Sequence, residues 1–519
     1  MTPAPAQGVR AAESSGDGVA AAPAAAEPRG FAREAFVYGL GVVLSRIVSF
    51  LMLPIYTRYL TPADYGVLQL LQITIDVTAI VLSAGLMTGV MRFYLKAASD
   101  RERSEVISTA FALLVASNAI GTAALVLLSP RIAALVLSGS GADGPLLVRI
   151  VAATFTFEAF VTVPLLLLQV LRKPVGYTVA SLSKLALQLA LNILLVVGLG
   201  WGARGVLVGT LVATAALGAV LTPWMLRRTG LRFSRSAMRD LRRFGVPYQV
   251  ATAGTFILTF GDRFFLEASH GLAAVGLYGL AYQFGFLLSG LGAQPYFRAW
   301  APQRLGLSTR PRPERDPAYA RSFLHLNLVQ VTLAVGIGLL IRPVLVLMSA
   351  PDFHAAAPLV PVILGAFVLQ AWTDAVALGI EVSEQTRYAT FATWLSVFLI
   401  LALYASLIPP FGGMGAAVAT LIASAARFLL TWRWSHRLWP TSWHFAPNLR
   451  LFAYGAACVG ALQLLAPSGL GGALVAAGGL GLVYLAAILI DPLGADVREL
   501  VASAPARLRR LVAPAAPRL

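Results

Sequence analysis

Charged residues are scarce in this chain. Only 12% of its 519 residues are Asp, Glu, Lys or Arg, whereas a soluble domain has about 25%. Hydrophobic residues make up 58% of the sequence, and the mean hydropathy is +0.76. This composition excludes an ordinary soluble domain and indicates an all-α polytopic membrane protein.

Cysteine is almost absent too. A single residue, Cys458, rules out an intramolecular disulfide, and the five histidines are scattered without the spacing of a metal site. The sequence has no phosphate-binding P-loop, which argues against ATP hydrolysis by this chain. We therefore expect neither a metal centre nor an organic cofactor, and only Na⁺ or H⁺ as a coupling ion. The net charge of +17 does not indicate nucleic acid, because Arg gathers in the cytoplasmic loops of membrane proteins.

Long apolar segments recur along the chain. The first, Ala35–Tyr59, has about 25 residues, enough to cross a hydrocarbon core of roughly 30 Å. The pattern predicts about fourteen transmembrane helices, at residues 35–59, 66–91, 106–128, 146–170, 175–198, 204–226, 245–267, 272–297, 322–347, 358–381, 387–408, 413–434, 449–466 and 470–490.

Basic residues alternate between the connections of these spans. The second, fourth, sixth, eighth and twelfth connections are rich in Arg and Lys, and the odd-numbered ones hold at most one basic residue each. The tenth fits weakly, with Arg387 alone. Because basic loops stay in the cytoplasm, both termini are expected on the cytoplasmic side.

A weak internal repeat suggests two halves. Tyr65–Leu68 resembles Val275–Tyr278, and Gly202–Leu211 resembles Gly412–Leu421, both at an offset of 210 residues. Six spans fit into each unit, so the repeats would be parallel, as in many transporters with a substrate path between them. The predicted organisation is a disordered cytoplasmic tail (1–32), an N-terminal six-helix lobe (33–226), a basic cytoplasmic linker (227–244), a C-terminal six-helix lobe (245–435), two extra transmembrane helices (436–490) and a cytoplasmic tail (491–519).

Four spans carry polar residues at helical spacing, which places them on one face of each helix. Lipid cannot satisfy such a stripe, so these faces predict a hydrated central cavity between the lobes. An alternative for the threonines is a bond to their own helix four residues back. The stripes are Gln69, Gln72, Asp76 and Ser83; Ser181, Lys184, Gln188 and Asn192; Tyr248, Thr252, Thr255, Thr259 and Asp262; and Gln370, Asp374 and Glu381.

Cations at membrane depth are the main candidates for a binding site. Arg46 and Lys184 lie near mid-span, and Arg263 and Arg427 are candidates for the rims of the cavity. A charge at the bilayer centre costs about 3 kcal/mol or more, so such residues face protein or water. Arginine binds phosphate and other oxyanions well, which favours an anionic substrate.

Other interpretations of these charges remain open. Arg46 with Asp76, and Lys184 with Glu158, lie at matching depths on sequential spans and could form structural ion pairs. Asp76, Glu158 and Asp374 would then either hold the basic residues or bind coupling cations. Arg263, like Asp262, lies near a span end, where we expect it to extend to the membrane interface.

Three stretches carry a family resemblance. They are Leu44–Gln72, Arg243–Leu266 followed by Ala274–Phe284, and Pro409–Ala425. In order and spacing they resemble the O-antigen and exopolysaccharide flippases of the multidrug/oligosaccharidyl-lipid/polysaccharide exporter superfamily, which include lipopolysaccharide biosynthesis membrane proteins. The likeness runs from about residue 33 to 440.

This resemblance implies a function. The chain would be a non-enzymatic flippase of a bacterial inner membrane that moves an undecaprenyl-pyrophosphate-linked oligosaccharide to the outer leaflet by alternating access. Arg46 would contact the pyrophosphate, with Lys184 as second candidate. Tyr278 and Tyr282 are candidates for stacking on sugar, though we expect packing for both, and Gln72 is a further sugar-contact candidate. Polymerases and glycosyltransferases of the same pathway would be partners.

Departures from related families bear on the alternatives. Lipid II flippases, a sister family, typically have Arg-Asp where this chain has Met52-Leu53, which argues against a peptidoglycan role. Multidrug exporters often have an acidic residue within the first span, where this chain has only Glu34 at the edge. A cation-coupled drug exporter of the same fold remains the second hypothesis. A membrane glycan polymerase or ligase is the third, disfavoured by the short outer loops.

Overall fold

The computed structural model describes residues 52–82, 86–138, 143–465, 467 and 469–491. The described residues form helices without any strand. In chain order they are α2 (Pro62–Leu82), α3 (Leu86–Lys96), α4 (Asp100–Leu127), α5 (Ser129–Val136), α6 (Gly144–Val170), α7 (Pro174–Asn192), η2 (Ile193–Gly198), α8 (Gly202–Thr229), α9 (Arg235–Phe260), α10 (Asp262–Leu288), η3 (Ser289–Ala293), α11 (Gln294–Leu307), α12 (Arg312–Met348), η4 (Pro351–Ala356), α13 (Leu359–Val376), α14 (Leu378–Val382), α15 (Arg387–Leu438), α16 (Phe445–Leu465) and α17 (Gly469–Ile490).

Eleven helical stretches in the described residues are long and apolar enough to cross a membrane. Two of them, Thr252–Ala301 and Arg387–Leu438, have 50 and 52 residues, which at 1.5 Å per residue is about two and a half times the hydrocarbon thickness. Each contains a glycine in the left-handed region, Gly271 (φ 76°) and Gly412 (φ 54°), where the helix is interrupted. The all-α polytopic fold is thus confirmed. The total of fourteen stays a prediction, because most of its first span lies outside the described residues.

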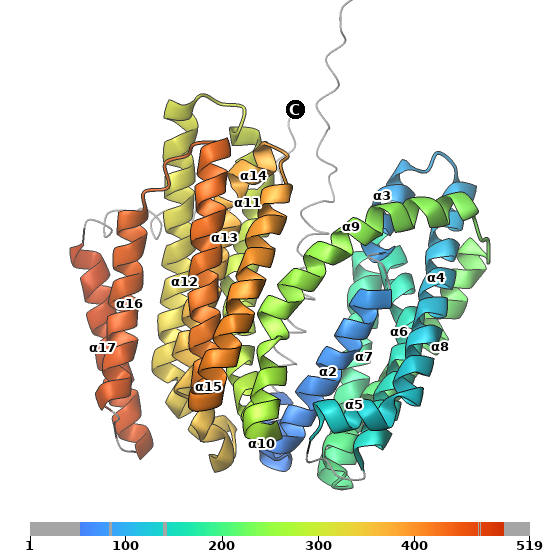
Figure 1. The fold of residues 1–519 in the computed structure, drawn as a ribbon, viewed down its shortest axis with the longest axis horizontal. Helices are drawn as coiled ribbons and strands as arrows, with labels where there is room; N and C mark the ends of the chain where they lie inside the picture. The colour runs from blue at the N-terminus through green and yellow to red at the C-terminus, as the bar shows by residue number, and fades with distance from the viewer. Residues whose placement is uncertain (1–51, 83–85, 139–142, 466, 468, 492–519) are drawn as a thin grey trace, which may run out of the picture.

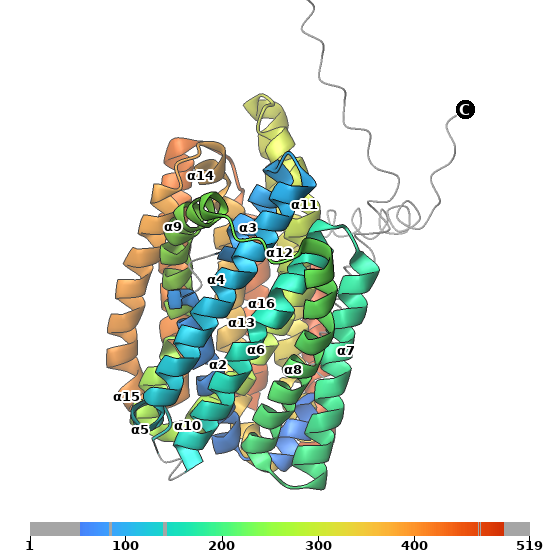
Figure 2. The same ribbon diagram turned by 90° about the vertical axis from the view of Figure 1, so that its right-hand side faces the viewer.

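The helices form two bundles (Figure 1). We call α2–α8 the N-lobe and α10–α15 the C-lobe; α16 and α17 flank the C-lobe by packing on α12. The lobes meet where α2 crosses α10 and lean apart towards the end that carries α3 and the start of α9. Figure 2 shows α4, α6, α8 and α7 as a row of steeply inclined helices in the N-lobe. The described residues thus form two helical bundles, and the division into two six-helix lobes with the predicted boundaries stays a prediction.

Helix α9 joins the lobes along its length. Its first half belongs to the N-lobe: Leu241 is fully buried in a cluster with Val90, and the ring of Phe244 meets that of Phe93 at 6.0 Å. Its second half contacts α15 of the C-lobe, where Gly254 lies against Trp394. The helix begins inside the predicted linker 227–244, with the Ser234 hydroxyl accepting a bond from the Ala237 N–H. Much of that linker is therefore a helix.

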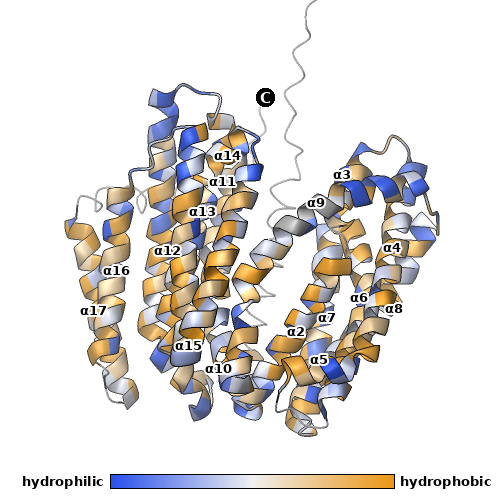
Figure 3. Ribbon diagram, viewed as in Figure 1, coloured by the Kyte–Doolittle hydropathy of each residue, from blue (hydrophilic) through white to orange (hydrophobic). Residues whose placement is uncertain are grey.

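Polar residues gather at one end of the molecule, and apolar residues cover the sides of the helix bundles. Figure 3 shows hydrophilic residues gathered at the end where the lobes lean apart, including the α3–α4 and α11–α12 connections, and hydrophobic residues along the walls. Exposed side chains on the walls include Leu464 at 89% and Val475 at 77%, as expected for surfaces that face lipid. We call the hydrophilic end the basic end; by the positive-inside rule it is the predicted cytoplasmic side.

The crossing of α2 and α10 is a close glycine contact. A Cβ placed on Gly66 would lie 2.0 Å from the Leu272 carbonyl oxygen, and one on Gly276 would lie 1.9 Å from that of Pro62. These two contacts are related by the repeat offset of 210 residues. Small residues allow helix backbones to approach closely in membranes. The lobes therefore touch at equivalent points of the two repeats.

The same symmetry extends to polar contacts around the crossing. The Thr57 hydroxyl donates to the Met348 carbonyl at 3.1 Å, and the Ser138 N–H donates to Glu267 Oε1 at 2.9 Å. Thr57 and Glu267 are again 210 residues apart, as are Ser138 and Met348. The Arg58 guanidinium adds a bond to the Leu347 carbonyl at 3.1 Å. These contacts tie the lobes together at the end opposite the basic one.

Candidate functional site

The N-lobe holds an ion pair inside its membrane-spanning part. Lys184 Nζ on α7 lies 3.6 Å from Glu158 Oε2 on α6, and the two side chains are 23% and 44% exposed. Of the two pairs that sequence depth suggested, the structure brings this one together. On α2, Gln72 Nε2 donates to Asp76 Oδ1 at 3.1 Å. Arg46, the other member of the second suggested pair, lies outside the described residues.

The C-lobe arranges its polar groups in a chain. Arg427 Nη1 on α15 donates to Gln370 Oε1 at 3.0 Å, and Gln370 Nε2 donates to Asp374 Oδ1 at 2.9 Å. The amide thus stands between the cation and the carboxylate. On the same side of the lobe, the Arg304 guanidinium is bonded to the Glu381 carboxylate and lies 3.5 Å from the Asp374 carbonyl. The sequence placed Arg304 in a loop, whereas it lies on α11.

A second charged group in the C-lobe is wholly enclosed. Asp262 and Arg263 are both 0% exposed, and Arg263 Nη1 lies 2.6 Å from Asp262 Oδ1 and donates to the Thr259 carbonyl at 2.7 Å. The guanidinium also stands over the Tyr282 ring at 4.1 Å. The expectation that Arg263 reaches the membrane interface is therefore wrong. Although Arg263 lies near the end of a predicted span, its side chain points into the helix bundle.

Two tyrosines suggested for sugar contact belong to this enclosed group. The Tyr278 hydroxyl donates to Asp262 Oδ2 at 2.6 Å, and Tyr278 itself is 0% exposed. Tyr282 is 2% exposed and packs edge-on against Phe367 at 5.7 Å. Both rings thus have the packing contacts that we expected for them. Tyr282 also lines the cavity described next, so one of the two borders open space.

A cavity of about 260 Å³ lies within the C-lobe between α9, α10, α13 and α15. Its polar lining comprises hydroxyl groups, one amide and one guanidinium, and Ala and larger apolar side chains fill the rest. The polar residues are Thr255, Thr259, Tyr282, Gln370, Thr420, Ser424 and Arg427. The threonine stripe predicted on the seventh span thus reaches a real cavity, although the Thr259 hydroxyl also bonds the Thr255 carbonyl at 2.8 Å.

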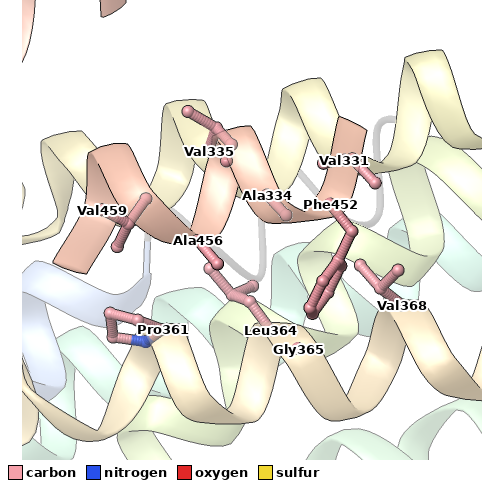
Figure 4. Close-up of a pocket in the computed structure, with 11 residues that line it drawn as sticks. Val331, Ala334, Val335, Pro361, Leu364, Gly365, Val368, Phe452, Ala456 and Val459 are labelled. Carbon is pink, nitrogen blue, oxygen red and sulfur yellow. The ribbon is translucent and has the colours of Figure 1, made fainter. Parts of the chain in front are cut away.

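Another cavity, of about 70 Å³, lies between α12, α13 and α16 and is apolar. Figure 4 shows Val331, Phe452, Val459 and Leu364 bordering it. No charged or hydrogen-bonding side chain lines this space. It therefore has no chemistry for an anionic group. Of these two cavities, the one with Arg427 is the candidate polar site.

Sequence reasoning missed part of this site. Ser424 was not noted, and Gln370 was noted only as a member of a polar stripe. A signal was present, because Thr420, Ser424 and Arg427 are spaced as i, i+4 and i+7 and so share one helix face. In the described residues, no cluster of three or more His, Cys, Asp or Glu side chains is placed to hold a metal ion. The expected lack of a cofactor stays a prediction.

The fold is shared with known membrane transporters. Among solved structures, the chain is similar to one described as lipid II flippase MurJ in an inward closed conformation, with a TM-score of 0.68 and 12% identity over 88% of this chain and 99% of that one. It is also similar to an inward-facing multidrug resistance MATE family transporter of the MOP superfamily, with a TM-score of 0.60 and 16% identity over 76% of this chain and 94% of that one. These similarities establish a MurJ/MATE-like fold.

The sequence itself identifies the family. The family described as Polysaccharide biosynthesis protein matches residues 31–303, more than half of the chain. A comparison with curated proteins gives no match. The chain therefore belongs to the polysaccharide biosynthesis protein family, a multi-pass membrane protein with the fold of MOP-superfamily transporters, and the family resemblance read from the sequence is confirmed.

Proposed function

We propose that this protein is a flippase for an undecaprenyl-pyrophosphate-linked oligosaccharide, working in a bacterial inner membrane during polysaccharide biosynthesis. The family match over residues 31–303 is the observation that carries this proposal. The flippase would itself make or break no covalent bond. Glycosyltransferases that build the lipid-linked glycan and a polymerase that extends it would act before and after it.

Alternating access is the proposed mechanism. The lobes are tied together at the end opposite the basic one by the Gly66–Gly276 crossing and the contacts of Thr57 and Glu267. At the basic end they lean apart (Figure 1). A rigid-body rotation that opens the glycine crossing and closes the basic end would expose a bound head group to the other side. The pseudo-symmetric contacts support such a rotation, because they sit near the axis that relates the lobes.

A drug exporter of the same fold is the second candidate. The likeness to a MATE family transporter, with a TM-score of 0.60, favours it. The family match favours the flippase. The two candidates predict different deletion phenotypes. Only the loss of a flippase would leave a lipid-linked glycan on the cytoplasmic leaflet.

A deletion strain tests the proposal. We expect lipid-linked glycan to accumulate in the inner membrane and surface glycan to fall, both reversed by the wild-type gene. The measurement is the amount of lipid-linked glycan accessible on the cytoplasmic leaflet. Unchanged surface glycan in a strain without paralogues, together with new sensitivity to drugs, would refute the flippase and establish the exporter.

A further inference from the structure

Arg427 differs from the other described candidate cations in what balances its charge. Lys184 faces the Glu158 carboxylate at 3.6 Å, and Arg263 faces that of Asp262 at 2.6 Å. Arg427 is held instead by the neutral amide of Gln370. None of the ion pairs within 4 Å among the described residues includes it.

This difference determines which cation can accept an incoming anion. An anion that approached Lys184 or Arg263 would have to displace a carboxylate already in place, and at Arg263 that carboxylate would be left uncompensated in an enclosed site. An anion that approached Arg427 would displace only an amide from direct contact, although the Asp374 carboxylate beyond Gln370 also interacts electrostatically with this guanidinium. A guanidinium has five N–H donors, and the bond to Gln370 uses one of them. Other N–H donors of Arg427 are therefore available to a ligand.

The cavity next to Arg427 also contains groups that suit hydroxyls. The Thr259 and Thr420 hydroxyls donate to carbonyls of their own helices, at 2.8 Å and 2.9 Å. The Thr420 oxygen also lies 3.4 Å from the Tyr404 hydroxyl, whereas the Thr259 oxygen supplies an acceptor for a ligand. Arg427 and Ser424 supply donors one helical turn apart on α15. The Tyr282 and Phe367 rings border the same space. Donors for an oxyanion thus lie beside an acceptor and aromatic surface for a hydroxylated ring.

We propose that this C-lobe cavity is a subsite for an oxyanion borne on a sugar, with the oxyanion at Arg427 and Ser424 and a ring hydroxyl at Thr259. The cavity volume of about 260 Å³ is large enough for one such ring. The inference rests on the proposed function, since it makes the subsite part of the path of the lipid-linked glycan. Two sources supply this chemistry: the phosphate that carries the first sugar, and the carboxylate of an acidic sugar.

The test measures binding by the purified full-length protein in detergent, without transport. The probes are glucose 1-phosphate, glucuronate, neutral glucose and inorganic phosphate, titrated by calorimetry. We expect one of the first two to bind more tightly than both glucose and inorganic phosphate, because charge and ring both contribute. Tighter glucose 1-phosphate assigns the subsite to the phosphate of the lipid carrier. Tighter glucuronate assigns it to an acidic sugar of the glycan.

Three variants locate the binding. Arg427→Gln is expected to weaken it about tenfold or more, the value of a lost charged hydrogen bond. Arg427→Lys retains the charge without the fork of donors and is expected to weaken it less. Gln370→Glu retains Arg427 but places a carboxylate next to it, so we expect this variant to abolish binding. It also tests the subsite if Arg427→Gln does not fold. Arg433→Gln, an exposed position on the same helix, is the matched control and is expected to stay within about twofold of wild type.

The outcomes separate this inference from the proposed function. Equal binding by wild type, Arg427→Gln and Gln370→Glu would overturn the subsite, as would glucose binding as tightly as both charged sugars. The deletion strain described above reports on the flippase independently. Accumulated lipid-linked glycan together with unaltered binding in the variants would reject the subsite and keep the flippase. Weakened binding without accumulation would reject the flippase and leave an oxyanion-sugar site.

Discussion

The N-lobe and the C-lobe both carry charge inside their membrane-spanning parts, and they balance it in different ways. The N-lobe pair of Lys184 and Glu158 is partly exposed, with 3.6 Å between the charged atoms. The C-lobe has one pair sealed in its core, Asp262 with Arg263, and one cation, Arg427, that hydrogen-bonds an amide and has the Asp374 carboxylate beyond it. The repeats share a fold without sharing chemistry. Two bundles of similar fold can thus differ in which of their buried charges are paired, through a few polar residues.

The largest effect is expected from Arg263→Gln, which breaks the buried ion pair of the C-lobe. Breaking a buried ion pair leaves the Asp262 carboxylate uncompensated, and we expect a loss of about 3–5 kcal/mol in the free energy of unfolding. Unfolding in SDS, followed by circular dichroism, measures the loss. The double variant Asp262→Leu/Arg263→Met is expected to recover most of it, because no buried charge remains. Arg101→Gln, in a pair with a 77% exposed arginine, is the control and should change stability by about 1 kcal/mol or less. A loss as small as the control's would show that the pair is hydrated.

The next effect concerns the contact that the lobes share. Gly66→Ala and Gly276→Ala each place a methyl group about where a backbone carbonyl of the other lobe lies, 2.0 Å and 1.9 Å away. We expect both variants to separate α2 from α10 and to reduce surface glycan about tenfold. The two reductions should be equal, since the positions are equivalent in the repeat. A cysteine at Leu272 in a Cys458→Ser background should react faster with a thiol reagent added from outside. Gly460→Ala, where a Cβ has no neighbour within 4 Å, is the control.

Unequal effects of the two glycine variants would break the symmetry argument. The result would mean that one lobe carries the movement while the other stays fixed. If neither variant changed surface glycan or thiol reactivity, the crossing would not be a moving contact at all, and the proposed rotation would need a different axis.

The smallest expected effect belongs to the N-lobe pair. Lys184→Gln removes a partly exposed ion pair, which contributes about 0–1 kcal/mol, so the thermal unfolding midpoint should shift by only a few degrees. Because Glu158 already balances this lysine, we expect surface glycan to stay within about twofold of wild type. Surface glycan lost in a stably folded Lys184→Gln protein would contradict this and make Lys184 a substrate contact.

Much of the fold could be predicted from the sequence. Apolar segments of membrane-spanning length predict helices, because an unpaired backbone is too costly in lipid. The offset of 210 residues reappears in the structure as paired contacts, Gly66 with Leu272 and Gly276 with Pro62. The pairing of Lys184 with Glu158 was also within reach, since sequential spans lie side by side and depth can be counted along each of them.

Other features depended on which way each helix faces. Arg263 and Lys184 looked like similar membrane cations in the sequence, yet one is sealed beneath Tyr282 and the other is partly exposed. Helix α9 looked like a linker followed by a span, but its first half packs in the N-lobe and its second half in the C-lobe. Neither the burial of Arg263 nor the division of α9 between the lobes can be predicted from neighbouring residues in the sequence. Both depend on contacts with residues far away in the chain.

Hydropathy, the repeat offset and the family motifs are properties of the chain itself, and they were enough to predict a two-lobed helical membrane protein of the polysaccharide biosynthesis family. Which charges are paired with a carboxylate and which are not depends on how the helices pack against one another. Arg427 meets Gln370 rather than a carboxylate because α13 and α15 pack with that register. A charge is balanced by its neighbours in space, and those neighbours exist only once the helices have packed.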